Sequence, residues 1–418
     1  LLFRSDLNSQ ISAPTLAKFD KNLSSKDAVL YNLEKARLLQ VNHQYEESAE
    51  VYKKAFELLE KQNNRAKVSV SRLGFKALSM LSNDSIVPYD VPPYEQVLAH
   101  ISQAKNYIFL KDSEAASVEM RIAQRIQREI EIDHEKELEK KSAKASKNEP
   151  SNPALENVDE AFAGLNTIAG KIKNTYQNAY AFYMAANLWE AVGESNDALV
   201  DYKKAYELQP DTNLAKDVQR LDRSPARGKG AVPVIVFIEQ GIVPKKIENK
   251  LALPMPNGIM NIAFATYEPS TYVNPESLNI KLGNKAQRSF VLNDIGALAV
   301  KDLKEKMVGT VTSQILRATT KYAAQQQLGQ QLGSLGQLAG NLMNIATERA
   351  DLRAWSTLPS NTQIARFDVA PGKHNLQIFG KRANSEPVSL DVAANQTVFV
   401  YVNDVNERIT TSISTISY

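Results

Sequence analysis

Apolar side chains recur at helical spacing through most of the first half of the chain. The spacing covers Asn32 to Glu60, Tyr94 to Leu110, Glu114 to Leu138 and Phe182 to Pro210. Residues three and four positions apart share one face of a helix, so each stretch predicts a helix or a helix pair. Acidic and basic residues alternate over about 128–153, which indicates a solvated helix end that leads into a linker.

The first and last of these stretches repeat one pattern of small and aromatic residues. A small residue lets two helices cross closely, an aromatic ring fills the space beside it, and a proline stops the second helix. This spacing is typical of a tetratricopeptide repeat (TPR) and predicts a TPR-like helical repeat domain over residues 1–222. The matched pairs are Ala36 with Ala186, Leu39 with Trp189, Ser48 with Ala198, Tyr52 with Tyr202 and Ala55 with Ala205, and Pro210 closes the second copy.

Stacked repeats of this kind form a curved surface that binds extended segments of partner proteins. We expect polar side chains of the first helices to line that surface, and Asn32 and Asn187 are the candidate partner-binding residues. The alternative is that the repeats only pack the domain together.

The pattern changes at a linker over residues 223–231. Short β-branched runs follow, and they predict a middle β-containing domain over residues 232–295. A long helical segment is expected over 296–350, and alternation such as that of Val398, Val400 and Val402 predicts an antiparallel β domain over 351–418. The expected fold class is therefore α+β and multidomain, with the helical repeats separable from the β part.

An uncharged amphipathic stretch covers residues 322–347 of the long helical segment. At 1.5 Å per residue it would be roughly 39 Å long as a helix, against a hydrocarbon core of ~30 Å. A lone transmembrane helix is a poor interpretation, because its many glutamine and asparagine side chains would face lipid.

Small and leucine side chains in this stretch form a seam with alternating spacings of three and four, and glycines recur beside it. Such a pattern indicates close helix-to-helix contact, so we expect an oligomer or membrane helix that self-associates. The alternative is a helix packed on its own β domain. The candidate residues are Leu328, Leu332, Leu335, Ala339, Leu342, Gly329, Gly333, Gly336 and Gly340.

The amino-acid composition limits the classes of function that the chain can have. Fifty Lys and Arg against 47 Asp and Glu leave a net charge of +3, so nucleic acid is not an expected partner. The chain has no cysteine, which excludes sites that depend on a thiolate, and its four histidines are few candidates for proton transfer or metal binding. Glu239 and Glu248 flank the phrase Gly241 to Lys246, but nothing makes them a catalytic pair. We expect no enzyme, and no catalytic, cofactor-binding or metal-binding residue.

Five separated phrases, in this order, resemble a poorly characterised TPR-containing family of predicted bacterial outer-membrane lipoproteins. The resemblance implies a lipid-anchored protein at the periplasmic face of the outer membrane and carries no catalytic residues. The chain starts at Leu1 and not at Met, so we expect a removed leader that ends in a lipid-acceptor cysteine. The phrases are Asp27 to Glu34, Ser82 to Asp84 with Pro88 and Tyr89, Ala116 to Arg121, Gly241 to Lys246, and Ala350 to Trp355 with Leu358 and Pro359.

The sequence thus predicts a non-enzymatic scaffold lipoprotein of the cell envelope. It would bind other envelope proteins through its TPR-like surface, form a homo-oligomer, and assemble into an outer-membrane-associated ring or pore, partly embedded in the membrane through residues 322–347. The alternative is a lipoprotein activator of peptidoglycan synthesis, and a cell-wall-acting enzyme is the third hypothesis.

Overall fold

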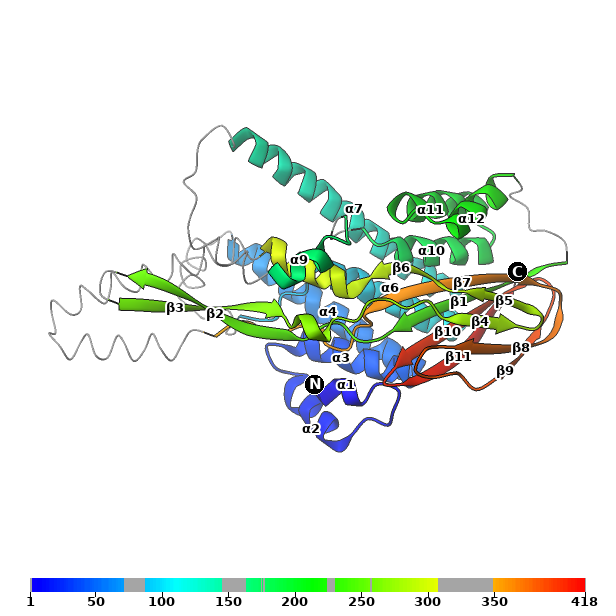
Figure 1. Cartoon of the computed structure of the whole chain (residues 1–418), viewed down its shortest axis with the longest axis horizontal. Helices are drawn as coiled ribbons and strands as arrows, with labels where there is room; N and C mark the ends of the chain where they lie inside the picture. The colour runs from blue at the N-terminus through cyan, green and yellow to red at the C-terminus, as the bar shows by residue number, and fades with distance from the viewer. Residues whose placement is uncertain are drawn as a thin grey trace.

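A computed structural model describes residues 2–70, 87–144, 163–173, 175, 177–223, 230–255, 258–306 and 349–417. The fold is mixed α+β, as expected (Figure 1). The helices are α1 (Leu2–Ser5), α2 (Ala13–Asn22), α3 (Ala28–Val41), α4 (Tyr45–Val70), α6 (Pro93–Phe109), α7 (Ser113–Lys144), α9 (Ala163–Ala169), α10 (Ala179–Ala191), α11 (Ser195–Leu208) and α12 (Thr212–Arg223), and one more covers residues 295–306.

Successive helices pack as the antiparallel pairs α3/α4, α6/α7 and α10/α11, with α4 against α6 and α7 against α10. We call these six helices the helical array. The small residues predicted at the crossings are buried: Ala36, Ala55, Ala186 and Ala205 have no exposed surface. The pair α6/α7 repeats the pattern, with Ala104 twelve residues before Ala116 and then Met120 and Ala123, all buried. Sequence analysis had not recognised this copy, in which methionine replaces the tyrosine.

The three pairs also turn in the same way. His43, Lys111 and Gly193 each follow a first helix with a positive φ of 64°, 62° and 89°. In each turn the next amide reaches back to the matched position of the first helix, as Glu194 N does to Trp189 O over 2.7 Å. This bonding satisfies carbonyls at the helix end and reverses the chain within a few residues.

The strands are β1 (Val232–Gln240), β2 (Lys246–Met255), β3 (Gly258–Tyr267), β4 (Asn279–Leu282), β5 (Lys285–Arg288), β6 (Phe290–Asp294), β7 (Asn361–Val369), β8 (Gly372–Phe379), β9 (Val388–Val392), β10 (Gln396–Val405) and β11 (Arg408–Ser417). They form a five-stranded sheet in the order β11-β10-β1-β7-β6, a four-stranded sheet in the order β5-β4-β8-β9, and the two-stranded β2–β3 ribbon. Sequence analysis missed β2, β5 and β6.

The division into two β domains, residues 232–295 and 351–418, needs correction. Both sheets contain strands from both stretches, and β1 pairs antiparallel with β7 but parallel with β10. One face of each strand forms a core between the two sheets, with Val236 and Val400 among its buried residues. The two stretches therefore build one β sandwich, because each supplies only part of each sheet.

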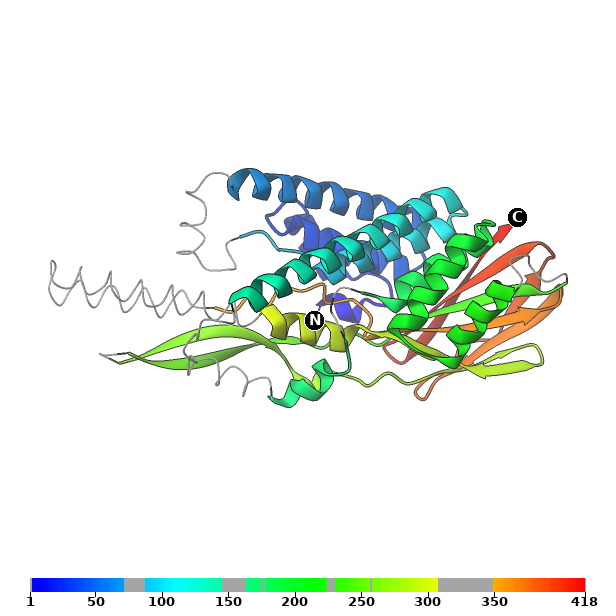
Figure 2. The ribbon, with the colours of Figure 1, turned by 90° about the horizontal axis from the view of Figure 1, so that it is seen from above.

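The opposite face of the five-stranded sheet packs on the helical array. Ile235 and Phe237 of β1 and Phe399 of β10 belong to the same hydrophobic core as Tyr180 and Trp189 of the helices. The molecule thus has three layers, helices, five-stranded sheet and four-stranded sheet (Figure 2). The helical repeats and the β sandwich share a core, which corrects the expectation that they are separable.

The β2–β3 ribbon projects from the sandwich along the long axis of the molecule (Figure 1). Ala263 and Ala265 of β3 form a small core with Ala350, and Leu303 of the helix over 295–306 packs against it. This helix and the segment that begins at Arg349 therefore lie against the base of the ribbon.

Candidate functional site

A segment without helix or strand over residues 349–360, which we call the strap, joins the base of the ribbon to β7. It crosses the face of α3 and α6 before the chain enters the five-stranded sheet at Asn361. Trp355 has no exposed surface and Leu358 is 2% exposed, so both belong to the main core. The strap is thus a peptide segment bound by helices of its own chain.

Arg353 anchors the first half of the strap. Its guanidinium forms an ion pair with Asp27, just before α3, and donates to the carbonyl oxygen of Val87 over 2.8 Å. Its other nitrogens bind both carboxylate oxygens of Asp351, at 2.8 and 2.6 Å. Burial lowers the pKa of Arg353, but the carboxylates of Asp351 and Asp27 outweigh it and raise the pKa. Burial raises the pKa of Asp351, but the hydrogen bonds and charge of Arg353 outweigh it and lower the pKa. A two-pronged pair of this kind holds the arginine in one orientation.

Glu34 on α3 holds the second half of the strap. Its Oε1 accepts the backbone N–H of Ser356 at 2.6 Å and the Ser356 hydroxyl at 2.7 Å, and Oε2 accepts the Thr357 hydroxyl. Glu34 is 2% exposed, and burial raises its pKa even though these three donors act in the opposite direction. Buried carboxylates require such donors, because an ionised group without them is costly in the protein interior.

Glu95 on α6 lies beneath Trp355. Its carboxylate accepts the hydroxyl of Tyr89 at 2.7 Å and, more weakly, the backbone N–H of Trp355 at 3.4 Å. Burial raises the pKa of Glu95 to about 7, against the hydrogen bonds from Tyr89 and Trp355 and the charge of Lys246. Proton uptake by this carboxyl therefore falls near neutral pH.

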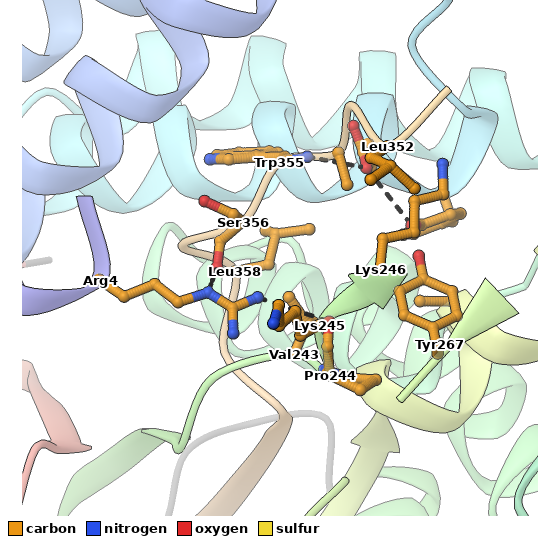
Figure 3. Close-up of a pocket in the computed structure, with 14 residues that line it drawn as sticks. Arg4, Val243, Pro244, Lys245, Lys246, Tyr267, Leu352, Trp355, Ser356 and Leu358 are labelled. Carbon is orange, nitrogen blue, oxygen red and sulfur yellow. Dashed lines mark hydrogen bonds between the residues drawn. The ribbon is translucent and has the colours of Figure 1, made fainter. Parts of the chain in front are cut away.

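A cavity of about 170 Å³ lies beside the strap, between α1, α6, the ribbon and the helix over 295–306. Arg4, Lys245 and Lys246 bring positive charge to its wall, and Figure 3 shows the Arg4 guanidinium reaching the carbonyl oxygens of Ser356 and Pro244. Burial lowers the pKa of both Arg4 and Lys246. None of the described residues that line this cavity is a histidine.

Charged side chains of the first helices face the five-stranded sheet. Arg37 of α3 and Lys105 of α6 both contact the carboxylate of Glu239 on β1, and the Tyr401 hydroxyl donates to the same carboxylate over 2.6 Å. Lys105 is 1% exposed, and burial together with the nearby Arg37 lowers its pKa. Glu239 thus joins helices to sheet, while Glu248 on β2 accepts the N–H of Ala350 over 2.9 Å.

Asn32 and Asn187 do not line an open partner-binding surface, so this prediction is wrong for the chain as folded. They are 1% and 2% exposed, and each side-chain amide donates to a carbonyl of its own helix, at 2.7 and 2.8 Å. Asn187 Oδ1 also accepts from Arg366 of β7 over 3.2 Å. Asn187, Arg37 and Lys105 occupy the same repeat position, and that position points to the sheet because the β sandwich covers this face.

The residues predicted for self-association lie outside the described part of the chain. They are Leu328, Leu332, Leu335, Ala339, Leu342, Gly329, Gly333, Gly336 and Gly340, within the expected helix over 322–347. Both flanks of this region are described, and Leu303 and Ala350 meet on Ala263 and Ala265.

Within the described ranges, no three histidine, aspartate or glutamate side chains gather closely enough to hold a metal ion. None of the described helices combines the length and apolar character needed to cross a bilayer. Comparison with known proteins finds no matching family model, no matching curated protein and no matching solved structure.

Proposed function

We propose that this protein is a non-enzymatic scaffold of the bacterial cell envelope, which assembles with further copies of itself and binds other envelope proteins. In this proposal it acts at the periplasmic face of the outer membrane through a lipid anchor. The five phrases that resemble a family of outer-membrane lipoproteins support this location.

One observation carries the assembly part of the proposal: described residues before and after one uncharged stretch of the sequence pack on the ribbon, which contains a second uncharged stretch. The ribbon has no charged residue from Leu251 to Tyr267, and the expected helix has none from Tyr322 to Thr347. Leu303 and Ala350, which lie on either side of residues 307–348 in the sequence, pack with Ala263 and Ala265 of the ribbon. Surfaces without charge avoid the desolvation cost of burying ions, so the ribbon suits an interface between copies or an apposed membrane.

The ribbon adds a second feature that suits assembly. Among the strands that the structure describes, β2 and β3 pair only with each other, so both are edge strands of a two-stranded ribbon. Edge strands can be extended by further strands, and proteins normally protect them with charged residues or proline. Lys246, Lys250 and Glu248 occupy the base of β2, and the uncharged run follows them toward the tip.

The oligomeric mass of the full chain in detergent tests this proposal. The wild type is expected to form a closed oligomer, and the double substitution Leu332→Glu with Leu335→Glu is expected to give a monomer with unchanged helix content. Leu16→Glu with Val200→Glu is the matched control, since these side chains are 45% and 59% exposed on α2 and α11. A wild-type monomer at every concentration, or a double mutant of native size, would contradict the assembly proposal.

A further inference from the structure

The strap occupies the face of α3 and α6 as a peptide ligand would. It forms no helix or strand, and both its side chains and its backbone contact the helices. Arg353 reaches Asp27, Trp355 enters the core near Tyr52 at a ring-centroid distance of 6.2 Å, and Ser356 binds Glu34. Arrays of helix pairs commonly bind extended segments in this way.

The fit of the strap is incomplete in three respects. The indole Nε1 of Trp355 is buried and has no hydrogen-bond partner among the described residues. Glu95, also buried, receives only a 3.4 Å contact from the strap. The cavity of about 170 Å³ remains beside Leu352, Trp355 and Leu358. An unpaired buried donor and an unfilled cavity both cost free energy, so a different extended segment can fit this site better.

We propose that the face of α3 and α6 is a docking site for a partner protein, that the strap is its internal competitor, and that a partner segment binds by displacing the strap. The proposal deepens the partner-binding part of the proposed function and is independent of self-assembly. The contacts of the strap define the partner chemistry: Asp27 takes a basic residue, the core site beside Tyr52 takes an aromatic residue two positions later, and Glu34 takes hydroxyl side chains.

Displacement of the strap would also disturb the contacts at its two ends. Ala350, at the start of the strap, packs on the ribbon, and Ser360, at its end, accepts the N–H of Gly296 over 2.8 Å. Gly296 lies in the helix that leads into residues 307–348. Both ends of the strap therefore contact elements outside the helical array, the ribbon at Ala350 and the helix over 295–306 at Ser360.

A peptide copy of the strap tests the proposal. A tethered segment competes at an effective concentration on the order of millimolar, so micromolar peptide should bind the wild type poorly. The probe is a fluorescent peptide of residues 349–359, and its control carries alanine at the positions of Arg353 and Trp355. Fluorescence anisotropy measures binding to the full-length protein in detergent.

Two substitutions break the same ion pair from opposite sides. Arg353→Ala weakens the strap but leaves the docking site intact, so peptide affinity should rise about tenfold over the wild type. Asp27→Ala weakens the strap and damages the site, so affinity should stay near that of the wild type. Arg349→Ala, at an exposed arginine of the same segment, is the matched control.

Equal affinities for Arg353→Ala and Asp27→Ala would overturn the proposal, because a purely structural ion pair predicts that outcome. Binding of the alanine control peptide as tightly as the strap peptide would do the same. Should Arg353→Ala unfold, Arg353→Lys keeps the charge but not the two-pronged pair with Asp351, and it should show a smaller rise. Failure here leaves the oligomer mass unchanged, so the two proposals are tested separately.

Discussion

The backbone N–H of Ser356 donates to Oε1 of Glu34 over 2.6 Å, which joins α3 to a residue 322 positions further along the chain. The same carboxylate accepts the hydroxyls of Ser356 and Thr357. One buried side chain thus determines where the strap turns, and the strap in turn closes the interface between the helical array and the β sandwich.

Replacing Glu34 should therefore destabilise the fold through the strap. Glu34→Ala leaves one N–H and two hydroxyls without their acceptor, and buried groups left unpaired cost about 1–3 kcal/mol. Urea unfolding followed by circular dichroism measures the loss, and Glu46→Ala, at an exposed glutamate of α4, should change the free energy of unfolding by less than about 0.5 kcal/mol. Equal effects of the two substitutions would show that Glu34 does not hold the strap.

Glu95 should make stability depend on pH between its ordinary pKa and about 7. A carboxyl whose pKa is raised in the folded state binds its proton more tightly there than in the unfolded chain. Its stabilising contribution is therefore complete below the unfolded pKa and is lost as pH rises through about 7. Glu95→Gln removes this loss, so the variant should gain about 2–3 kcal/mol relative to the wild type between pH 5 and pH 8.

Unfolding curves at several pH values measure this difference. Glu129→Gln, at a glutamate whose side chain is 67% exposed on α7, is the matched control and should parallel the wild type. A pH-independent difference between Glu95→Gln and the wild type would contradict the assignment.

Arg366 should be required for packing α10 and α12 on β7. Its guanidinium lies 3.2 Å from both carboxylate oxygens of Glu190, which also pairs with Arg220 at 2.7 Å. Burial by itself raises the pKa of Glu190, but Arg366 and Arg220 outweigh it and hold the pKa at about 2.

Arg366→Ala would leave a buried carboxylate only partly compensated, at a cost of about 3–5 kcal/mol. Arg125→Ala, at an arginine 67% exposed on α7, is the control for loss of one positive charge. The double substitution Arg366→Met with Glu190→Met should recover much of the stability, since apolar pairs often replace buried ion pairs. If the double mutant recovers no stability, the neighbouring residues Asn187 and Tyr202, and not the ion pair, stabilise the packing of α10 and α12 on β7.

The β sandwich should not fold alone. A chain of residues 230–418 would expose Ile235, Phe237, Ile364 and Phe399, which are all buried under the helices. Exposed apolar faces of this size promote aggregation, so the fragment should be insoluble or bind a hydrophobic dye, whereas coexpressed residues 1–223 should restore solubility. A soluble, cooperatively folding fragment would show that the shared core is dispensable.

The sequence by itself determined the six helices of the helical array, most of the strands and two of the three repeated helix pairs. These depend on local periodicity: Ala36, Tyr52 and Ala55 match Ala186, Tyr202 and Ala205 because each helix pair needs small and large residues at the same contacts. The spacing of Ala104, Ala116 and Ala123 would have revealed the third pair, had Met120 been accepted in place of the aromatic residue.

Only the tertiary structure decided what covers the repeats. A buried polar side chain and a partner-binding one look alike in sequence, and Asn187 was assigned to a surface although Arg366, 179 positions away, contacts it. The order of the strands could not be predicted from the sequence either, because the pairing of β1 with β7 and β10 joins residues more than a hundred positions apart. Periodicity records which face of an element is apolar, but the partner of that face is set by packing across the whole chain.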